Sequence, residues 1–99
     1  MDRINENYLI TDSISVGGVE YVLGVHTNHQ NMYVTWECID GDDYRWGHYH
    51  NSEVKAKADL LNRALHAVEY WTYLATHKEV YINYSEIEKL ITDDKPEEV

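Results

Sequence analysis

Cysteine is nearly absent from this chain: its 99 residues include a single one, Cys38. One thiol cannot close an internal disulfide bond, and small secreted domains usually depend on several such bonds. A disulfide-stapled secreted scaffold is therefore excluded, and a reducing compartment is favoured. We expect a cytoplasmic protein.

Long apolar runs are also missing. The apolar stretches span only a few residues, whereas a helix that crosses a bilayer needs about 20. The start Met1-Asp2-Arg3 is charged, and no apolar segment of the signal-peptide type follows it. The sequence thus predicts no association with a membrane.

Basic residues are scarce. Eight Lys and Arg stand against 18 Asp and Glu, which gives a formal net charge of -10. A surface of this sign repels phosphate groups and anionic lipids, so direct binding to nucleic acid is not expected. Acidity keeps a small protein soluble, and it also suits a protein partner with a basic surface.

The length and composition predict one folded domain. Apolar residues make up 43% of the chain, which is enough to exclude global disorder, and a chain of this size holds one core. The last residues are acidic and have nothing to bury. We predict a single α+β domain over residues 1–92 and an acidic flexible tail over 93–99.

The first half of the chain has the pattern of β-strands. Apolar and polar residues alternate up to Gly17-Gly18, a pair that accepts positive φ at both positions of a tight hairpin turn. Asp40-Gly41-Asp42-Asp43 has the composition of a second turn. The resulting antiparallel four-stranded meander has strands at Tyr8–Val16, Val19–His26, Tyr33–Ile39 and Tyr44–His50. A fifth strand over Glu79–Tyr84 is left open, with an extended connector as the alternative.

The pattern changes at Asn51-Ser52, where either side chain can cap a helix. Apolar residues then follow the three-and-four spacing of one buried helix face. We predict that this long helix buries Val54, Ala58, Leu61, Leu65 and Val68, widened by Ala64, Trp71 and Ala75. Ser85-Glu86-Ile87-Glu88 matches a capping box and predicts a second, shorter helix that turns Ile87, Leu90 and Ile91 inward.

Residues suited to catalysis or metal binding do not form a recognisable motif. Cys38 alternates with Val34 and Trp36 and is expected in the core, and adjacent acids in a glycine-containing turn are typical of solvated turns. The chain has neither an HExxH nor a CxxC pattern. We therefore predict no enzyme activity and no cofactor. A metal-dependent enzyme using His26, His48 and His50 is kept as the weakest alternative.

Phenylalanine is absent, while tyrosine occurs nine times and tryptophan three times. Such side chains combine an apolar body with a polar group and are enriched at protein interfaces. We assign Trp36, Trp46 and Trp71 to packing in the core or on the sheet. Tyr81 and Tyr84 are less easily turned inward and are candidates for a contact surface.

The acidic residues gather in two places, around the Asp40–Asp43 turn and in the last part of the chain. Carboxylates spaced like backbone phosphates on a rigid domain can occupy a basic nucleic-acid groove. The predicted partner-binding residues are Glu37, Asp40, Asp42, Asp43, Tyr81, Tyr84, Glu86, Glu88, Asp93 and Asp94.

In size, charge and acid clustering the chain resembles the small acidic inhibitors that phages and mobile elements use against restriction and CRISPR nucleases. The resemblance is carried by Asp40-Gly41-Asp42-Asp43 and by the region from Glu86 to Glu98. It implies a DNA mimic that occupies the basic surface of a partner, such as a nuclease. The alternative is a structural or assembly module, for example a homodimer, that pairs through an exposed sheet face including Trp46 and Tyr49.

Overall fold

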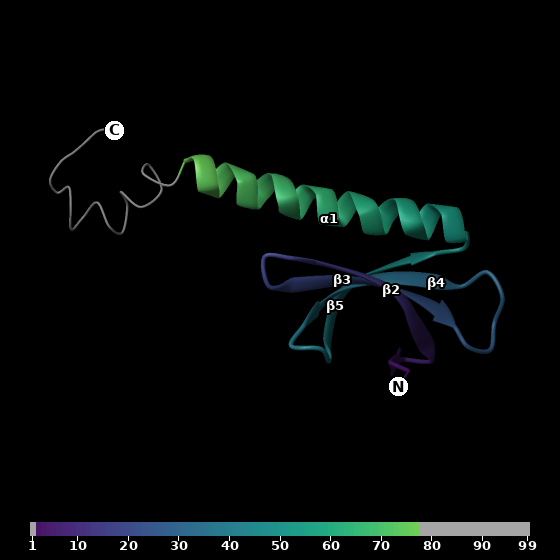
Figure 1. The fold of residues 1–99 in the computed structure, drawn as a ribbon. Helices are drawn as coiled ribbons and strands as arrows, with labels where there is room; N and C mark the ends of the chain where they lie inside the picture. The colour runs from purple at the N-terminus through teal and green to yellow at the C-terminus, as the bar shows by residue number, and fades with distance from the viewer. Residues whose placement is uncertain (1, 78–99) are drawn as a thin grey trace, which may run out of the picture. The chain divides into compact units, whose positions relative to one another are not determined.

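The computed structural model describes residues 2–77, which form one antiparallel sheet followed by one helix. The elements are β1 (Ile4–Asn5), β2 (Tyr8–Val16), β3 (Val19–His26), β4 (Tyr33–Ile39), β5 (Asp43–His50) and α1 (Glu53–Thr76). The five strands lie in chain order, each antiparallel to the next, and the sheet curls into a half-barrel (Figure 1). The predicted α+β fold, a meander against one long helix, is confirmed.

Tight turns explain why neighbouring strands pair. Gly17 and Gly18 both have positive φ, 61° and 85°, as predicted for the hairpin between β2 and β3. Glu6 and Asn7 also have positive φ, and they join β1 to β2 in the same way. This turn creates β1, a strand that the sequence did not predict because neither turn residue is a glycine.

β5 begins at Asp43, one residue before the predicted start. The predicted segment Glu79–Tyr84 and the predicted second helix lie outside the described residues, as does the predicted tail over 93–99.

The helix-capping residues predicted at Asn51-Ser52 are confirmed, since the Ser52 hydroxyl accepts a hydrogen bond from the Lys55 amide at 3.4 Å.

The sheet buries apolar side chains on both faces. On the face away from α1, the curl encloses a cluster of five buried residues, Tyr8, Val22, Val34, Trp36 and Cys38. On the opposite face, Leu23 packs with Ala56 and Leu60 of α1. Trp36 and Cys38 are therefore core residues as predicted, and burial raises the pKa of the Cys38 thiol.

The helix contacts the sheet through a different face from the predicted one. Its buried residues are Ala56, Leu60, Ala64 and Ala67, whereas Val54, Ala58, Leu61, Leu65 and Val68 are exposed. Of the predicted set, only Ala64 is buried. Alanines let a helix lie close to a sheet, and the polar Asp59 and Arg63 on the same side find partners there. The prediction chose the bulkier of two apolar stripes, and it was wrong.

The chain separates into two compact units, with the boundary inside α1 between Val68 and Glu69. In the described part of the second unit, the Tyr70 and Trp71 rings pack edge to face, and the Tyr73 and His77 rings stack. Trp71 is exposed, so its assignment to the core was wrong. Within residues 2–77, no helix is both long enough and apolar enough to span a membrane.

Candidate partner-binding surface at the β4–β5 hairpin

Three of the predicted binding residues lie together at the tip of the β4–β5 hairpin. Asp40 and Asp42 are exposed in the loop, and Asp43 is exposed at the start of β5. Asp40 has a φ of 56° and Gly41 a φ of 83°, values that aspartate and glycine tolerate better than most residues. The aspartate and glycine residues that suggested this site in the sequence also form the turn that positions it.

The structure balances part of this acidic cluster with arginine. The Arg45 Nη2 and Nε atoms donate to Asp43 Oδ2 at 2.6 and 3.0 Å, and these hydrogen bonds lower the pKa of Asp43. Asp40 and Asp42 make no ion pair within 4.0 Å to any residue of the described part of the chain. They are therefore the strongest candidates for an uncompensated negative charge.

Glu37, the fourth predicted acid of this region, does not join the tip. It is half-buried on the side of the sheet that faces α1, and Glu37 Oε2 lies 4.0 Å from Arg63 Nη2. It also pairs in register with Arg45 on β5. Its basic neighbours are therefore Arg63 and, on the adjacent strand, Arg45. Strand alternation turns it away from Asp40 and Asp42.

Arg3 holds the hairpin tip to the N-terminus, a role that the sequence did not reveal. Its Nη1 and Nη2 atoms donate to the two carboxylate oxygens of Glu20 at 2.7 and 3.1 Å. Nη2 also lies 3.1 Å from the Tyr44 hydroxyl and 3.4 Å from the Gly41 carbonyl oxygen. The Arg3 hydrogen bond lowers the pKa of Glu20, against the opposing effect of burial. A contact between residues 38 positions apart leaves no local sequence signal.

Trp46 projects from β5 next to this acidic tip. Its side chain is 70% exposed, and its φ of 57° is unusual for a bulky residue. The register between β4 and β5 shifts here, and Arg63 Nη2 donates to the Trp46 carbonyl at 2.9 Å. The predicted core position of Trp46 was wrong, because this irregularity turns the side chain outward.

Gly47 explains why the strand takes this course. A Cβ atom at Gly47 would lie 2.9 Å from Trp36 Nε1 and 3.1 Å from the Tyr49 ring. Only glycine therefore lets β5 pass so close to the core tryptophan. Two features therefore hold the β5 backbone in the conformation that exposes Trp46: the close approach of Gly47 to Trp36 and the hydrogen bond from Arg63.

A polar cluster joins α1 to the sheet behind the hairpin. Asp59 Oδ2 accepts a hydrogen bond from Thr35 Oγ1 at 2.5 Å and lies 2.9 Å from His48 Nδ1 and 3.3 Å from His50 Nε2. Burial would raise the pKa of Asp59, but these three hydrogen bonds outweigh it and lower that pKa. Arg63 Nη1 donates to the Thr35 hydroxyl and carbonyl oxygens at 2.9 and 3.1 Å.

The histidines belong to separate clusters. His48 and His50 share Asp59, whereas His26 packs edge to face on Tyr8 and its Nδ1 accepts the backbone amides of Asn28 and His29. Within the described part of the chain, no three His, Cys, Asp or Glu side chains are grouped so that they could hold a metal ion. The metal-site alternative built on His26, His48 and His50 therefore has no geometric support here.

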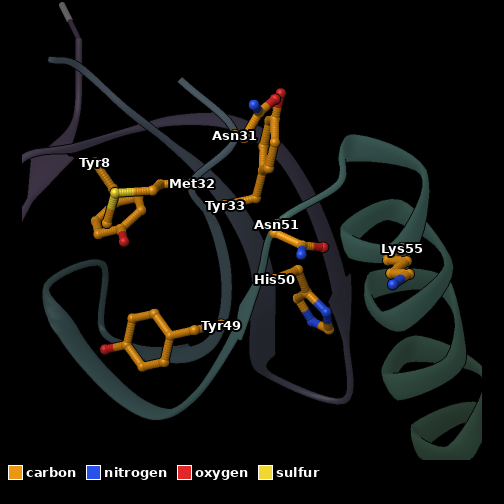
Figure 2. Close-up of a pocket in the computed structure, with 8 residues that line it drawn as sticks. All are labelled: Tyr8, Asn31, Met32, Tyr33, Tyr49, His50, Asn51 and Lys55. Carbon is orange, nitrogen blue, oxygen red and sulfur yellow. The ribbon is translucent and has the colours of Figure 1, made fainter. Parts of the chain in front are cut away.

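An open cavity of about 740 Å³ lies beside the start of α1 (Figure 2). Figure 2 shows Tyr8, Met32 and Tyr49 on one side of it and His50, Asn51 and Lys55 on the other. Asn31 and Tyr33 complete the lining. The walls combine aromatic rings with amides and one amine, a mixture that suits a partner side chain as well as a small polar molecule.

The remaining predicted binding residues, Tyr81, Tyr84, Glu86, Glu88, Asp93 and Asp94, lie outside the described residues. Comparisons of the chain with protein-family models, curated proteins and solved structures found no match.

The sequence predicted the acidic tip from the aspartate and glycine residues of its turn. It missed Arg3 and Arg63, and it placed Trp46 on an exposed face only in the assembly-module alternative, because each depends on contacts between distant strands or between helix and sheet.

Proposed function

We propose that the protein is a non-enzymatic, acidic binding protein that docks its β4–β5 hairpin on the basic surface of a protein partner. In this role it would inhibit or regulate a nucleic-acid-handling protein, such as a CRISPR or restriction nuclease, by occupying the surface that binds nucleic acid. The observation that carries the proposal is that Asp40 and Asp42, which have no ion-pair partner among residues 2–77, share one hairpin with the exposed Trp46.

The two kinds of side chain would act differently in such a complex. Carboxylates steer the encounter with a basic surface and help to select the partner. An aromatic side chain that becomes buried on binding supplies much of the affinity, and tryptophan is enriched among such residues. The backbone of Trp46 is already held by Arg63, so little ordering of this part of the backbone would be needed on docking.

The test begins with capture of the partner. The immobilised protein is exposed to a lysate of its native host, and bound proteins are eluted with rising salt and with competitor DNA. The proposal expects a nucleic-acid-binding protein that both treatments release, because exposed charges are screened by salt. A partner indifferent to both treatments would contradict the proposal.

Charge reversal at one position then locates the contact. Asp42→Lys should weaken binding to the captured partner by about tenfold or more, as expected when a like charge replaces a complementary one. Asp42 is preferable to Asp40, whose positive φ aspartate tolerates better than lysine does. Glu6→Lys is the matched control, since it makes the same charge change in another exposed turn; Glu6 also has a positive φ, but there one long side chain replaces another. Equal weakening by both variants would mean that only net charge matters.

A second candidate is an assembly module that pairs through the sheet face. It is favoured by the exposure of Tyr49, at 60%, on the same strand as Trp46. In that case Tyr49→Ser and Trp46→Ser would both reduce self-association, and salt would have little effect. Asp42→Lys would leave it unchanged.

A further inference from the structure

The helix α1 carries two apolar stripes on opposite sides. The inner stripe, which contacts the sheet, consists mostly of alanine. The outer stripe is formed by Val54, Ala58, Leu61, Leu65 and Val68, all of them exposed. Val54 is 77% exposed and Leu61 is 60% exposed. Large apolar side chains aligned on a solvent-facing helix surface are uncommon in a soluble monomer and mark an interaction site.

The spacing of the outer stripe indicates what kind of element covers it. Its residues follow one another at intervals of four, three, four and three positions, a repeat of two heptads. This period keeps a seam of side chains turned toward a second helix, with knobs packing into holes. The stripe from Val54 to Val68 extends about 21 Å along α1, at about 1.5 Å per residue. A helix with the same repeat is therefore the matching partner.

We infer that the outer stripe of α1 is the contact surface of an antiparallel homodimer, in which the same stripe of a second copy covers it. A two-fold contact requires a surface that is complementary to itself. In the stripe, valines stand at both ends and Leu61 in the middle, so an antiparallel copy places the small Ala58 opposite the larger Leu65. A second copy also supplies a helix with the matching heptad repeat.

The charges beside the stripe select the antiparallel orientation. Lys55 flanks its N-terminal end, Asn62 its middle and Glu69 its C-terminal end, whereas Lys57 is paired with Glu53 at 3.1 Å. In a parallel pair the two copies of Lys55 would lie at the same end of the seam, and like charges in close apposition are unfavourable. In an antiparallel pair each Lys55 lies at the end where the other copy carries Glu69, and the two helix dipoles also oppose one another. Of the flanking residues named, the neutral Asn62 is the one that comes close to its own copy.

This contact and the hairpin contact respond to salt in opposite ways. Two copies of a chain with a formal net charge of -10 repel one another, and salt screens this repulsion. The homodimer should therefore be as stable or more stable at high salt, whereas docking of the acidic hairpin should weaken. The dimer also does not use Asp40, Asp42 or Trp46. Failure of one proposal consequently leaves the other intact.

Sedimentation velocity of the full chain tests the inference, over concentrations from about 0.1 to about 500 µM that bracket a micromolar dissociation constant. A seam of two heptads is short, so we expect a reversible dimer of this affinity. Leu65→Asp should raise the dissociation constant by at least about tenfold, because each dimer would bury two unpaired carboxylates. Leu65 is exposed in the monomer, so the fold should persist, as far-UV circular dichroism would verify.

His66→Asp is the matched control. His66 is exposed on the helix but lies outside the stripe, and the substitution adds one negative charge to a neutral ring. It should leave the dimer intact. A wild-type chain that stays monomeric throughout, or equal effects of the two variants on the dimer, would overturn the inference.

Disulfide cross-linking tests the orientation. Cys38 is buried and can remain in place as an unreactive thiol. Under mild oxidation, Asn62→Cys should form a covalent dimer, because position 62 lies near the two-fold axis. Lys55→Cys should cross-link at least about tenfold more slowly, since the two copies would lie at opposite ends of the seam. Equal rates would contradict the antiparallel arrangement.

Discussion

The two faces of the sheet are stabilised in different ways. On the curled face, Tyr8, Val22, Val34, Trp36 and Cys38 form a continuous apolar cluster. On the face toward α1, the apolar contact centres on Leu23, Ala56 and Leu60, and a cluster of hydrogen bonds runs beside it. Apolar packing is not directional, whereas hydrogen bonds to Asp59 and Arg63 are. The first face mainly supplies stability, and the second also selects which side of α1 meets the sheet.

The largest effect should come from the curled face. Trp36→Ala removes the ring that contacts Tyr8, Tyr44 and the space left by Gly47. We expect the free energy of unfolding to fall by about 3 to 5 kcal/mol, the range for loss of a large buried aromatic side chain. Urea denaturation followed by circular dichroism measures it. A loss below about 1 kcal/mol would show that this cluster does not dominate stability.

The next effect should come from the apolar contact on the helix side. Leu60→Ala leaves a cavity against Leu23 and should cost about 2 to 4 kcal/mol in unfolding free energy. Leu61→Ala, one position along the same helix, is the control and should cost less than about 0.5 kcal/mol per monomer. Urea denaturation at a concentration where the chain is monomeric compares the two. If Leu61→Ala cost more unfolding free energy than Leu60→Ala, α1 would have to pack on the sheet through its outer stripe.

Removing the arginine of the polar cluster should have a smaller effect. Arg63→Met keeps much of the apolar side chain but leaves the carbonyls of Thr35 and Trp46 without their donor. We expect a loss of about 2 to 3 kcal/mol in unfolding free energy, the cost of buried acceptors that lose a charged partner. Quenching of tryptophan fluorescence should also change, since Trp46 loses its anchor. Unchanged quenching would show that the β5 irregularity is held without Arg63.

The smallest effect should be the pH-dependent contribution of Asp59. Burial raises the pKa of this carboxylate, but its hydrogen bonds with Thr35, His48 and His50 outweigh burial, so the pKa is lower than that of an unfolded aspartate. The stabilisation is therefore present at pH values above the unfolded pKa and is lost as pH falls through the lower folded pKa. Asp59→Asn should cost about 1 kcal/mol at neutral pH.

Acid titration of unfolding free energy tests this sign. Glu20 and Asp43 also have lowered pKa values, so the wild type and Asp59→Asn must be compared at each pH. The difference between them should shrink below about pH 4, where the unfolded aspartate becomes protonated. A difference that grows toward low pH would contradict the assigned direction.

Local patterns predicted most of the fold because the elements depend on neighbouring residues. Gly17-Gly18 and the Asp40–Asp43 turn set two hairpins, and Asn51-Ser52 marked the start of α1. β1 was missed, since its turn uses Glu6 and Asn7 instead of glycine. Of the candidate site, only the acidic loop was predicted, because a turn also depends on neighbouring residues.

The sequence alone therefore determined the hairpins of an antiparallel meander, the long helix and the acidic hairpin tip, all of which follow from short-range spacing and turn chemistry. Tertiary structure decided which stripe of α1 faces the sheet, because both stripes have helical spacing and only the inner one combines small side chains with partners for Asp59 and Arg63. It also decided that Trp46 is exposed, through a register shift that depends on Gly47 passing close to Trp36. Both outcomes rest on packing between distant segments, which local spacing does not encode.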